Sequence, residues 1–233
     1  EFKRMHDMTV EHAHEEIQLL ANDFSTMLFE TTYYLPSFAA YYKSHDQAPS
    51  YAYLKRSLQA LQFLRGPDRW VLKSPQHLEQ FGTLYATFPD ATFVVTHRDP
   101  VDVTRSMATM VAYASRMGAA HPDPVRTGRY WLDRAADLFT GCVRDRDVLP
   151  AAQSIDVRFT DFMADEEGTL ATVYELAGQP YDDTVRAAMR RFIADHPRGR
   201  HGEVSYDLAD VGLDADEVAR RLRPYRDRFL GES

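Results

Sequence analysis

Two polar segments, each following an apolar run, contain the residues whose types and spacing suit binding of a phosphate-like anion. Lys73 follows the run at residues 70–72, Arg98 follows shortly after the run at 92–96, and Ser106 lies eight residues beyond Arg98. An arginine fork and a hydroxyl can together clamp a phosphate through several hydrogen bonds. Because ligands gather outside the carboxyl ends of parallel strands, we expect Lys73 and Arg98 to converge on one crevice.

Short strands and capped helices are expected to position these side chains. Residues 70–72 and 92–96 have the length and apolar character of buried strands, and the segment between them has helical spacing. Ser74 and Asp99 each precede a proline, which is the usual order of a capping residue and a first helical position. This order of strand, helix and strand predicts a parallel unit whose helix N-termini favour an anion.

Helical spacing dominates the remaining chain, which we interpret as one α/β domain over residues 1–233 with a short parallel sheet flanked by helices. The first 65 residues are expected to be helix-rich. Further predictions are helices at 51–64, 74–88, 99–117, 130–148, 170–177, 184–193 and 214–229, a strand at 154–159, and a loop at 118–128. The sequence shows no internal repeat.

Bulk properties exclude several classes of protein. The formal net charge of −8 argues against a nucleic-acid binder, which needs a basic face, but it permits a local anion site. Cys142 is the single cysteine, so an internal disulfide is excluded, and this suits a cytoplasmic protein. No apolar run approaches the roughly 18–20 residues of a membrane span, and the first residues contain no signal-peptide apolar region.

A metal site is not expected. His12, His14, Glu15 and Glu16 are close in sequence but do not form the His-Glu-x-x-His pattern of zinc enzymes. Residues two apart lie on different faces of a helix, so these side chains cannot converge on one ion. A solvated helix is the better interpretation of this segment.

Four segments, in order along the chain, carry a family resemblance. They are Trp-Val-Leu-Lys-Ser-Pro-Gln-His at 70–77, Thr-Phe-Val-Val-Thr-His-Arg-Asp-Pro at 92–100, Ile-Asp-Val-Arg-Phe-Thr-Asp-Phe at 155–162 and Pro-Arg-Gly-Arg-His-Gly at 197–202. Together with Ser106, they resemble the bacterial branch of the sulfotransferases that use 3′-phosphoadenosine 5′-phosphosulfate (PAPS). The resemblance implies a P-loop-like α/β sulfotransferase fold and an enzyme that uses PAPS as donor and releases 3′,5′-ADP.

The same resemblance implies roles for the polar residues singled out above. Arg98 and Ser106 match the family residues that bind the 3′-phosphate. Arg198, Gly199 and Arg200 match its basic cofactor loop, although a solvated loop explains the two arginines equally well.

Two further residues are candidates for the catalytic step. Lys73 is expected to offset charge on the leaving group, against the alternative of a surface ion pair. His77 is a candidate base, against the alternative of a partly buried structural histidine. His97 is expected to be structural, because strand alternation turns it away from the face that Arg98 uses.

The sequence departs from the family pattern at two places. Phe159 stands where the family has a tyrosine, so a hydroxyl contact to the cofactor is missing or comes from elsewhere. The strand and the Gly/Arg/Ser/Thr-rich loop that surround the 5′-phosphosulfate in the family have no counterpart here, so we expect a chain truncated at its N-terminus.

The sequence favours a sulfotransferase that acts on a hydroxyl or amine of a small-molecule, lipid or sugar acceptor. The alternative is a non-catalytic module that binds 3′,5′-ADP or a partner, which the missing loop supports. Several aromatic residues are expected to line an apolar acceptor pocket, although core packing explains most of them equally well; they are Phe24, Phe29, Tyr33, Tyr34, Phe38, Tyr41 and Tyr42. The acceptor and the oligomeric state stay open.

Overall fold

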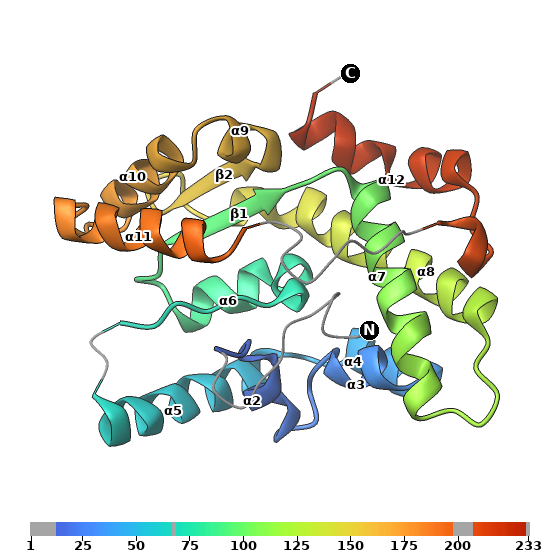
Figure 1. The fold of residues 1–233 in the computed structure, drawn as a ribbon. Helices are drawn as coiled ribbons and strands as arrows, with labels where there is room; N and C mark the ends of the chain where they lie inside the picture. Colours follow the sequence, from blue (N-terminus) through green and yellow to red (C-terminus); the bar gives the residue numbers. More distant parts are fainter. Residues whose placement is uncertain (1–12, 67–68, 198–206, 232–233) are drawn as a thin grey trace.

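The chain folds into many helices around one short sheet. The computed structural model describes residues 13–66, 69–197 and 207–231. Figure 1 shows α5 along one side of the molecule, the two strands near the opposite side, and α6 between them. The helices are α2 (Ile17–Ala21), α3 (Leu28–Thr32), α4 (Pro36–Ser44), α5 (Ala48–Arg65), α6 (Phe81–Thr87), α7 (Pro100–Ala114), α8 (Pro124–Asp145), α9 (Phe159–Ala164), α10 (Glu166–Leu176), α11 (Asp183–Asp195) and α12 (Ala215–Phe229). Short 3-10 helices occur at Pro75–Glu79 (η1), Ser115–Met117 (η2), Arg146–Val148 (η3) and Ala209–Val211 (η4).

The sheet consists of two parallel strands in the part of the chain that the structure describes. Strand β1 (Phe93–His97) pairs with β2 (Ser154–Arg158), and the register places His97 opposite Arg158. Inward and outward residues alternate along β1, as the pleat of a strand requires. Helices α7 and α8 connect the strands, because parallel neighbours need a long crossover.

Helix α7 begins where the sequence predicts it. The Asp99 carboxylate accepts a hydrogen bond from the Val101 backbone N–H at 2.8 Å, and Pro100 occupies the first turn. The same device begins α8, since Asp123 accepts from the Arg126 N–H at 2.9 Å and precedes a proline. The loop expected at 118–128 is therefore wrong beyond Asp123, because the helix begins at its cap.

The strand expected at residues 70–72 does not form among the described residues. Trp70 and Leu72 pack against the small apolar cluster of Leu20, Leu54 and Leu58, whereas the side chain between them is exposed to solvent. An apolar run makes a strand only when a neighbour accepts its backbone hydrogen bonds, and the described sheet offers none there. The parallel pair is instead formed by β1 and β2.

The helix expected at residues 74–88 is divided. Ser74 stands at the capping position of η1, but its side chain makes no capping hydrogen bond. Gln80 has φ −133° and ψ 24°, which is not helical, and it separates η1 from α6. The segment that carries Lys73 and His77 is therefore an extended stretch followed by a single tight helix.

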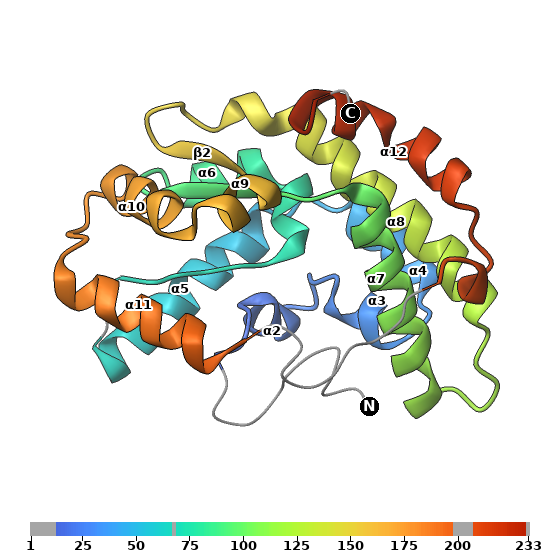
Figure 2. The same ribbon diagram turned by 45° about the horizontal axis from the view of Figure 1, so that its top comes forward.

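The main core lies where α7, α8 and α12 pack together, and Phe93 and Val95 of β1 belong to the same cluster. Trp131 and Leu132 of α8 and Val218 and Leu222 of α12 are all buried there. Figure 2 shows α12 running beside α8, and the two helices are in contact. The amphipathic spacing of these long helices provides the apolar stripes that meet in this core.

His97 is part of this core and has the structural role that alternation predicts. Its Nδ1 lies 2.8 Å from the Tyr225 hydroxyl, its Nε2 lies 2.7 Å from Asp156, and its ring stacks on Phe229 with centroids 4.3 Å apart. Burial lowers the pKa of His97 and outweighs the effect of Asp156, which favours the protonated ring. The folded protein therefore favours the neutral imidazole.

We expect this histidine to make stability depend on pH. As the pH falls below about 6.5, the unfolded chain binds a proton at His97 that the folded chain does not bind, so the folded state loses stability at a rate of at most about 1.4 kcal/mol per pH unit. Urea unfolding between about pH 7.5 and about pH 5.5 measures the dependence. The stability difference between wild type and His97→Gln should shrink toward acid, with His121→Gln on an exposed segment as control. A difference that is constant with pH contradicts this assignment.

Candidate functional site

The carboxyl ends of the two strands bring together an arginine and an aromatic ring. Arg98 directly follows β1, and Phe159 directly follows β2 opposite it, because His97 and Arg158 are paired. The guanidinium carbon of Arg98 lies 4.8 Å from the centroid of the Phe159 ring. Arg98 is exposed, and no carboxylate pairs with it among the residues that the structure describes. A positive charge is therefore presented to solvent at the end of the sheet, where ligands of open α/β sheets gather.

Helix α7 continues from this point and carries Ser106 on a half-buried position. Its first turn is already engaged, because Asp99 takes the Val101 N–H and Asp102 pairs with Arg105 at 2.5 Å. The Val101 N–H at the helix N-terminus is thus already taken by a carboxylate. The basic group available for an anion here is Arg98 itself.

Lys73 lies on the surface and is held by two adjacent glutamates of the N-terminal part. Its side chain is 74% exposed, and its ammonium group pairs with the Glu15 carboxylate. Its backbone N–H donates to Glu16 Oε2 at 2.8 Å. The described contacts connect Lys73 to the segment before α2 and not to Arg98, so the expected convergence of the two cations stays a prediction.

His77, in η1, is largely buried, with a side chain 12% exposed, and both of its ring nitrogens are engaged. Nδ1 lies 2.7 Å from the Tyr51 hydroxyl, and Nε2 lies 2.5 Å from Glu16 Oε1. Burial raises the pKa of Tyr51, so its hydroxyl keeps the proton and donates to Nδ1. Nε2 then carries the ring proton and donates it to Glu16.

Glu16 is the residue of this site that the sequence analysis missed. The interpretation of its segment as a solvated helix is wrong for Glu16, which is 5% exposed. Burial raises the pKa of Glu16, but the hydrogen bond and charge of His77 outweigh it and hold the pKa below the usual range. One carboxylate therefore anchors both predicted catalytic residues, Lys73 through its backbone and His77 through its ring. No local sequence pattern predicts this role of Glu16, because Lys73 and His77 lie far from it along the chain.

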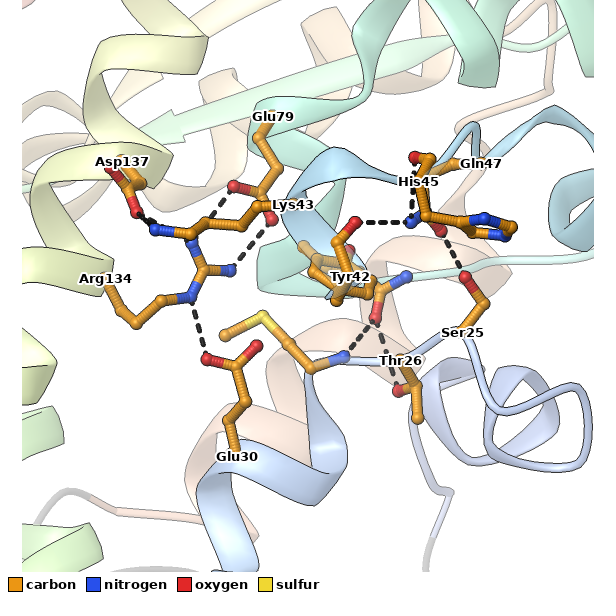
Figure 3. Close-up of polar contacts among 12 residues, drawn as sticks. Ser25, Thr26, Glu30, Tyr42, Lys43, His45, Gln47, Glu79, Arg134 and Asp137 are labelled. Atoms are coloured by element: carbon orange, nitrogen blue, oxygen red, sulfur yellow. Dashed lines mark hydrogen bonds and ion pairs between the residues drawn. The ribbon is translucent and has the colours of Figure 1, made fainter. Parts of the chain in front are cut away.

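A buried ionic network supports the helix that carries His77 (Figure 3). The Arg134 side chain is 2% exposed; its Nε donates to Glu30 at 3.0 Å, and its fork binds Glu79, the last residue of η1, at 2.9 and 3.2 Å. The Tyr130 hydroxyl also donates to Glu30, at 2.5 Å. Burial raises the pKa of Glu30 and outweighs the lowering effect of Arg134. The network thus joins α3, α8 and η1.

The remaining predicted site residues, Arg198, Gly199 and Arg200, lie outside the residues that the structure describes. Within the described ranges, no group of three or more His, Cys, Asp or Glu side chains could hold a metal ion. Those ranges also contain no helix long and apolar enough to cross a membrane.

Comparison with known proteins decides the family. A sequence model described as "Sulfotransferase family" matches residues 1–183, which is well over half of the chain and includes Lys73, His77, Arg98 and Ser106. This chain belongs to the sulfotransferase family. The resemblance stated from its motifs is thereby confirmed at the level of the family, whereas the individual residue roles stay predictions.

Solved structures of mycobacterial sulfotransferases share the fold of this family member. A crystal structure of sulfotransferase STF9 from Mycobacterium avium matches with a TM-score of 0.83 and 25% identity, over 94% of this chain and 56% of that chain. One of STF1 from Mycobacterium tuberculosis H37Rv matches with a TM-score of 0.80 and 30% identity, over 93% and 56%. The predicted α/β sulfotransferase fold is therefore confirmed.

A curated relative adds a named acceptor for another protein of the family. The omega-hydroxy-beta-dihydromenaquinone-9 sulfotransferase Stf3 of Mycobacterium bovis is 25% identical over 127 residues, which is 54% of this chain and 33% of Stf3. This sulfotransferase-family chain thus spans about half the length of the matched solved structures, and the match to the curated relative covers a third of that protein.

Proposed function

We propose that this chain binds PAPS and transfers its sulfo group to a hydroxyl or amine of a small-molecule, lipid or sugar acceptor. One observation carries the proposal. Arg98 stands exposed at the carboxyl ends of β1 and β2, and no carboxylate among the described residues pairs with it. A guanidinium whose N–H donors are uncommitted within the described ranges fits a phosphate monoester, which binds arginine through paired charge-assisted hydrogen bonds.

The donor side of the proposed site consists of residues at the strand ends and a later loop. Arg98 and Ser106 bind the 3′-phosphate, and Arg198, Gly199 and Arg200 add contacts from outside the described residues. Bound PAPS supplies the sulfo group, and 3′,5′-ADP is the product. Lys73 offsets negative charge on the leaving group, for which its ammonium must exchange Glu15 for the donor.

The base of the proposed reaction is His77. In the structure, the Tyr51 hydroxyl is hydrogen-bonded to His77 Nδ1. The acceptor hydroxyl must first replace the Tyr51 hydroxyl, and Nδ1 then takes the proton of the acceptor. Glu16 accepts the hydrogen bond from Nε2, holds the ring in this tautomer and stabilises the imidazolium that forms. Glu16 therefore acts by orienting His77, which in turn contacts the acceptor hydroxyl.

An apolar lipid alcohol is the acceptor class that we favour. Stf3 is named for omega-hydroxy-beta-dihydromenaquinone-9, and this chain exposes aromatic rings near its N-terminus. Phe24 is 71% and Tyr41 54% exposed, and ring contacts run from Phe24 through Phe29 and Phe38 to Tyr41. Core packing accounts for Tyr42, which is buried, but it does not account for the exposed rings of Phe24 and Tyr41. They offer an apolar surface to an isoprenoid chain.

Turnover with radiolabelled PAPS tests the proposed function. The chain is incubated with the donor and with an isoprenoid alcohol, a phenol or a sugar as acceptor, and sulfated product is separated and counted. We expect label on the isoprenoid alcohol above the level of the other two. Equal or absent product with the isoprenoid alcohol contradicts the favoured acceptor class, and absence of product from every acceptor contradicts the transferase.

A non-catalytic module that binds 3′,5′-ADP is the second candidate. Two observations favour it: both ring nitrogens of His77 are occupied by Tyr51 and Glu16, and the Lys73 ammonium is paired with Glu15. Binding of 3′,5′-ADP without sulfated product from any acceptor supports this candidate over the enzyme.

A further inference from the structure

Phe159 lies where the backbone pairing of the sheet must bring it close to Arg98. It is the first residue of α9 and follows Arg158, whose register partner is the residue before Arg98. The two arginines at the strand ends then diverge. Arg158 turns toward α12 and donates from Nε to the Phe229 carbonyl at 2.9 Å, whereas the Arg98 guanidinium lies over the Phe159 ring.

Unlike several other arginines of this protein, Arg98 has no carboxylate partner among the described residues. Arg134, Arg146 and Arg190 direct their N–H groups to carboxylates at 3.4 Å or less. A guanidinium held by a ring face keeps its N–H donors at its edge, where they stay available to another acceptor. An aromatic face also restrains a side chain that is otherwise free to adopt many rotamers.

We propose that Phe159 is a positioning residue, whose ring holds the Arg98 guanidinium at the carboxyl end of the sheet for a terminal phosphate such as the 3′-phosphate of PAPS. The inference rests on the proposed function and deepens it. The phenylalanine at this position does more than lack a hydroxyl. Its ring supplies a face for the guanidinium and leaves no competing acceptor atom beside the phosphate.

Affinities for two nucleotides that differ only in the 3′-phosphate test this inference. Calorimetric titration compares 3′,5′-ADP with 5′-AMP on wild type, Phe159→Leu and Phe159→Tyr. Leucine fills similar volume without a π face, so we expect the affinity for 3′,5′-ADP to fall about three- to five-fold while that for 5′-AMP is unchanged. Tyrosine restores the ring and should retain the wild-type affinity within about two-fold. Phe192→Leu, at a ring that is 60% exposed on α11, is the matched control.

Each other outcome has a distinct meaning. An equal fall for both nucleotides shows that the ring only stabilises the fold and overturns the inference, as does an unchanged affinity for 3′,5′-ADP. A wild type that binds neither nucleotide overturns the proposed function instead. The NMR signal of the Arg98 Nε–H tests, independently of nucleotide binding, whether the guanidinium lies over the Phe159 ring. A proton over a ring has an upfield shift, which must disappear in Phe159→Leu. Absence of that shift in the wild type overturns the positioning role.

Discussion

Arg134→Met lowers the free energy of unfolding by about 3–5 kcal/mol, because it leaves two acidic side chains of the interior without their positive partner. Arg134 is 1% exposed, and it binds Glu30, also 1% exposed, and Glu79. Methionine fills part of the volume but neutralises neither carboxylate. Urea unfolding followed by circular dichroism measures the loss.

Two comparisons distinguish the loss of stability in Arg134→Met from the loss that any arginine substitution on this helix would cause. Arg144→Met, on the same helix, removes a side chain that is 66% exposed and paired with Asp145, and it should change stability by less than about 1 kcal/mol. The loss in Arg134→Met should also be smaller in acid, because protonation of Glu30 removes the buried charge. A loss below about 1 kcal/mol, or one independent of pH, is incompatible with the network as described.

Arg98→Ala weakens the binding of 3′,5′-ADP by about 10- to 100-fold and leaves that of 5′-AMP unchanged. Charge-assisted hydrogen bonds contribute about 1.5–3 kcal/mol each, and about 1.4 kcal/mol corresponds to a factor of ten. The effect is confined to the 3′-phosphate because Arg98 is proposed to contact that group alone. Isothermal titration calorimetry of both nucleotides provides the measurement.

The chain offers a matched control for this substitution. Arg116 is also exposed, and its guanidinium lies 5.3 Å from the centroid of the Tyr113 ring, beyond the far end of α7. Arg116→Ala should leave both affinities unchanged. Arg98→Lys keeps the charge but loses the fork, so it should recover only part of the affinity. Equal effects of the alanine substitutions at 98 and 116 would mean that Arg98 contributes only general charge.

Local signals in the sequence predict the parts of the fold that local physics determines. Asp99 begins α7 because its side chain can accept from an amide two residues away, and this interaction needs no distant partner. Asp123 begins α8 by the same means, but the prolines on either side of it favoured a loop over residues 118–128, so the start of this helix was missed. The strand expected at 154–159 forms as Ser154–Arg158, and it was predictable because Ile155 and Val157 alternate with polar residues.

The rest depends on partners that are distant in sequence. Residues 70–72 have a strand-like composition, but a strand also needs a neighbour, which composition does not reveal. Arg134 lies on a predicted helix, but it is buried and paired with two glutamates only because α3 and η1 pack against that helix.

The candidate site divides in the same way. Arg98 was predictable as a residue at a strand end. The role of Glu16 was not predictable, because it depends on a hydrogen bond to His77, which is distant in sequence. The lost hydroxyl at Phe159 was visible in the sequence, but its ring face toward Arg98 was not.

A single pair of titrations on the wild-type chain tests the central claim, that the end of β1 forms a site for the 3′-phosphate of the sulfo donor. The ligands are 3′,5′-ADP and 5′-AMP, which share every group except that phosphate. The account predicts that 3′,5′-ADP binds at least about ten-fold more tightly, and that the difference shrinks as salt is added. Equal affinity for the two nucleotides, at low and at high salt, would contradict it.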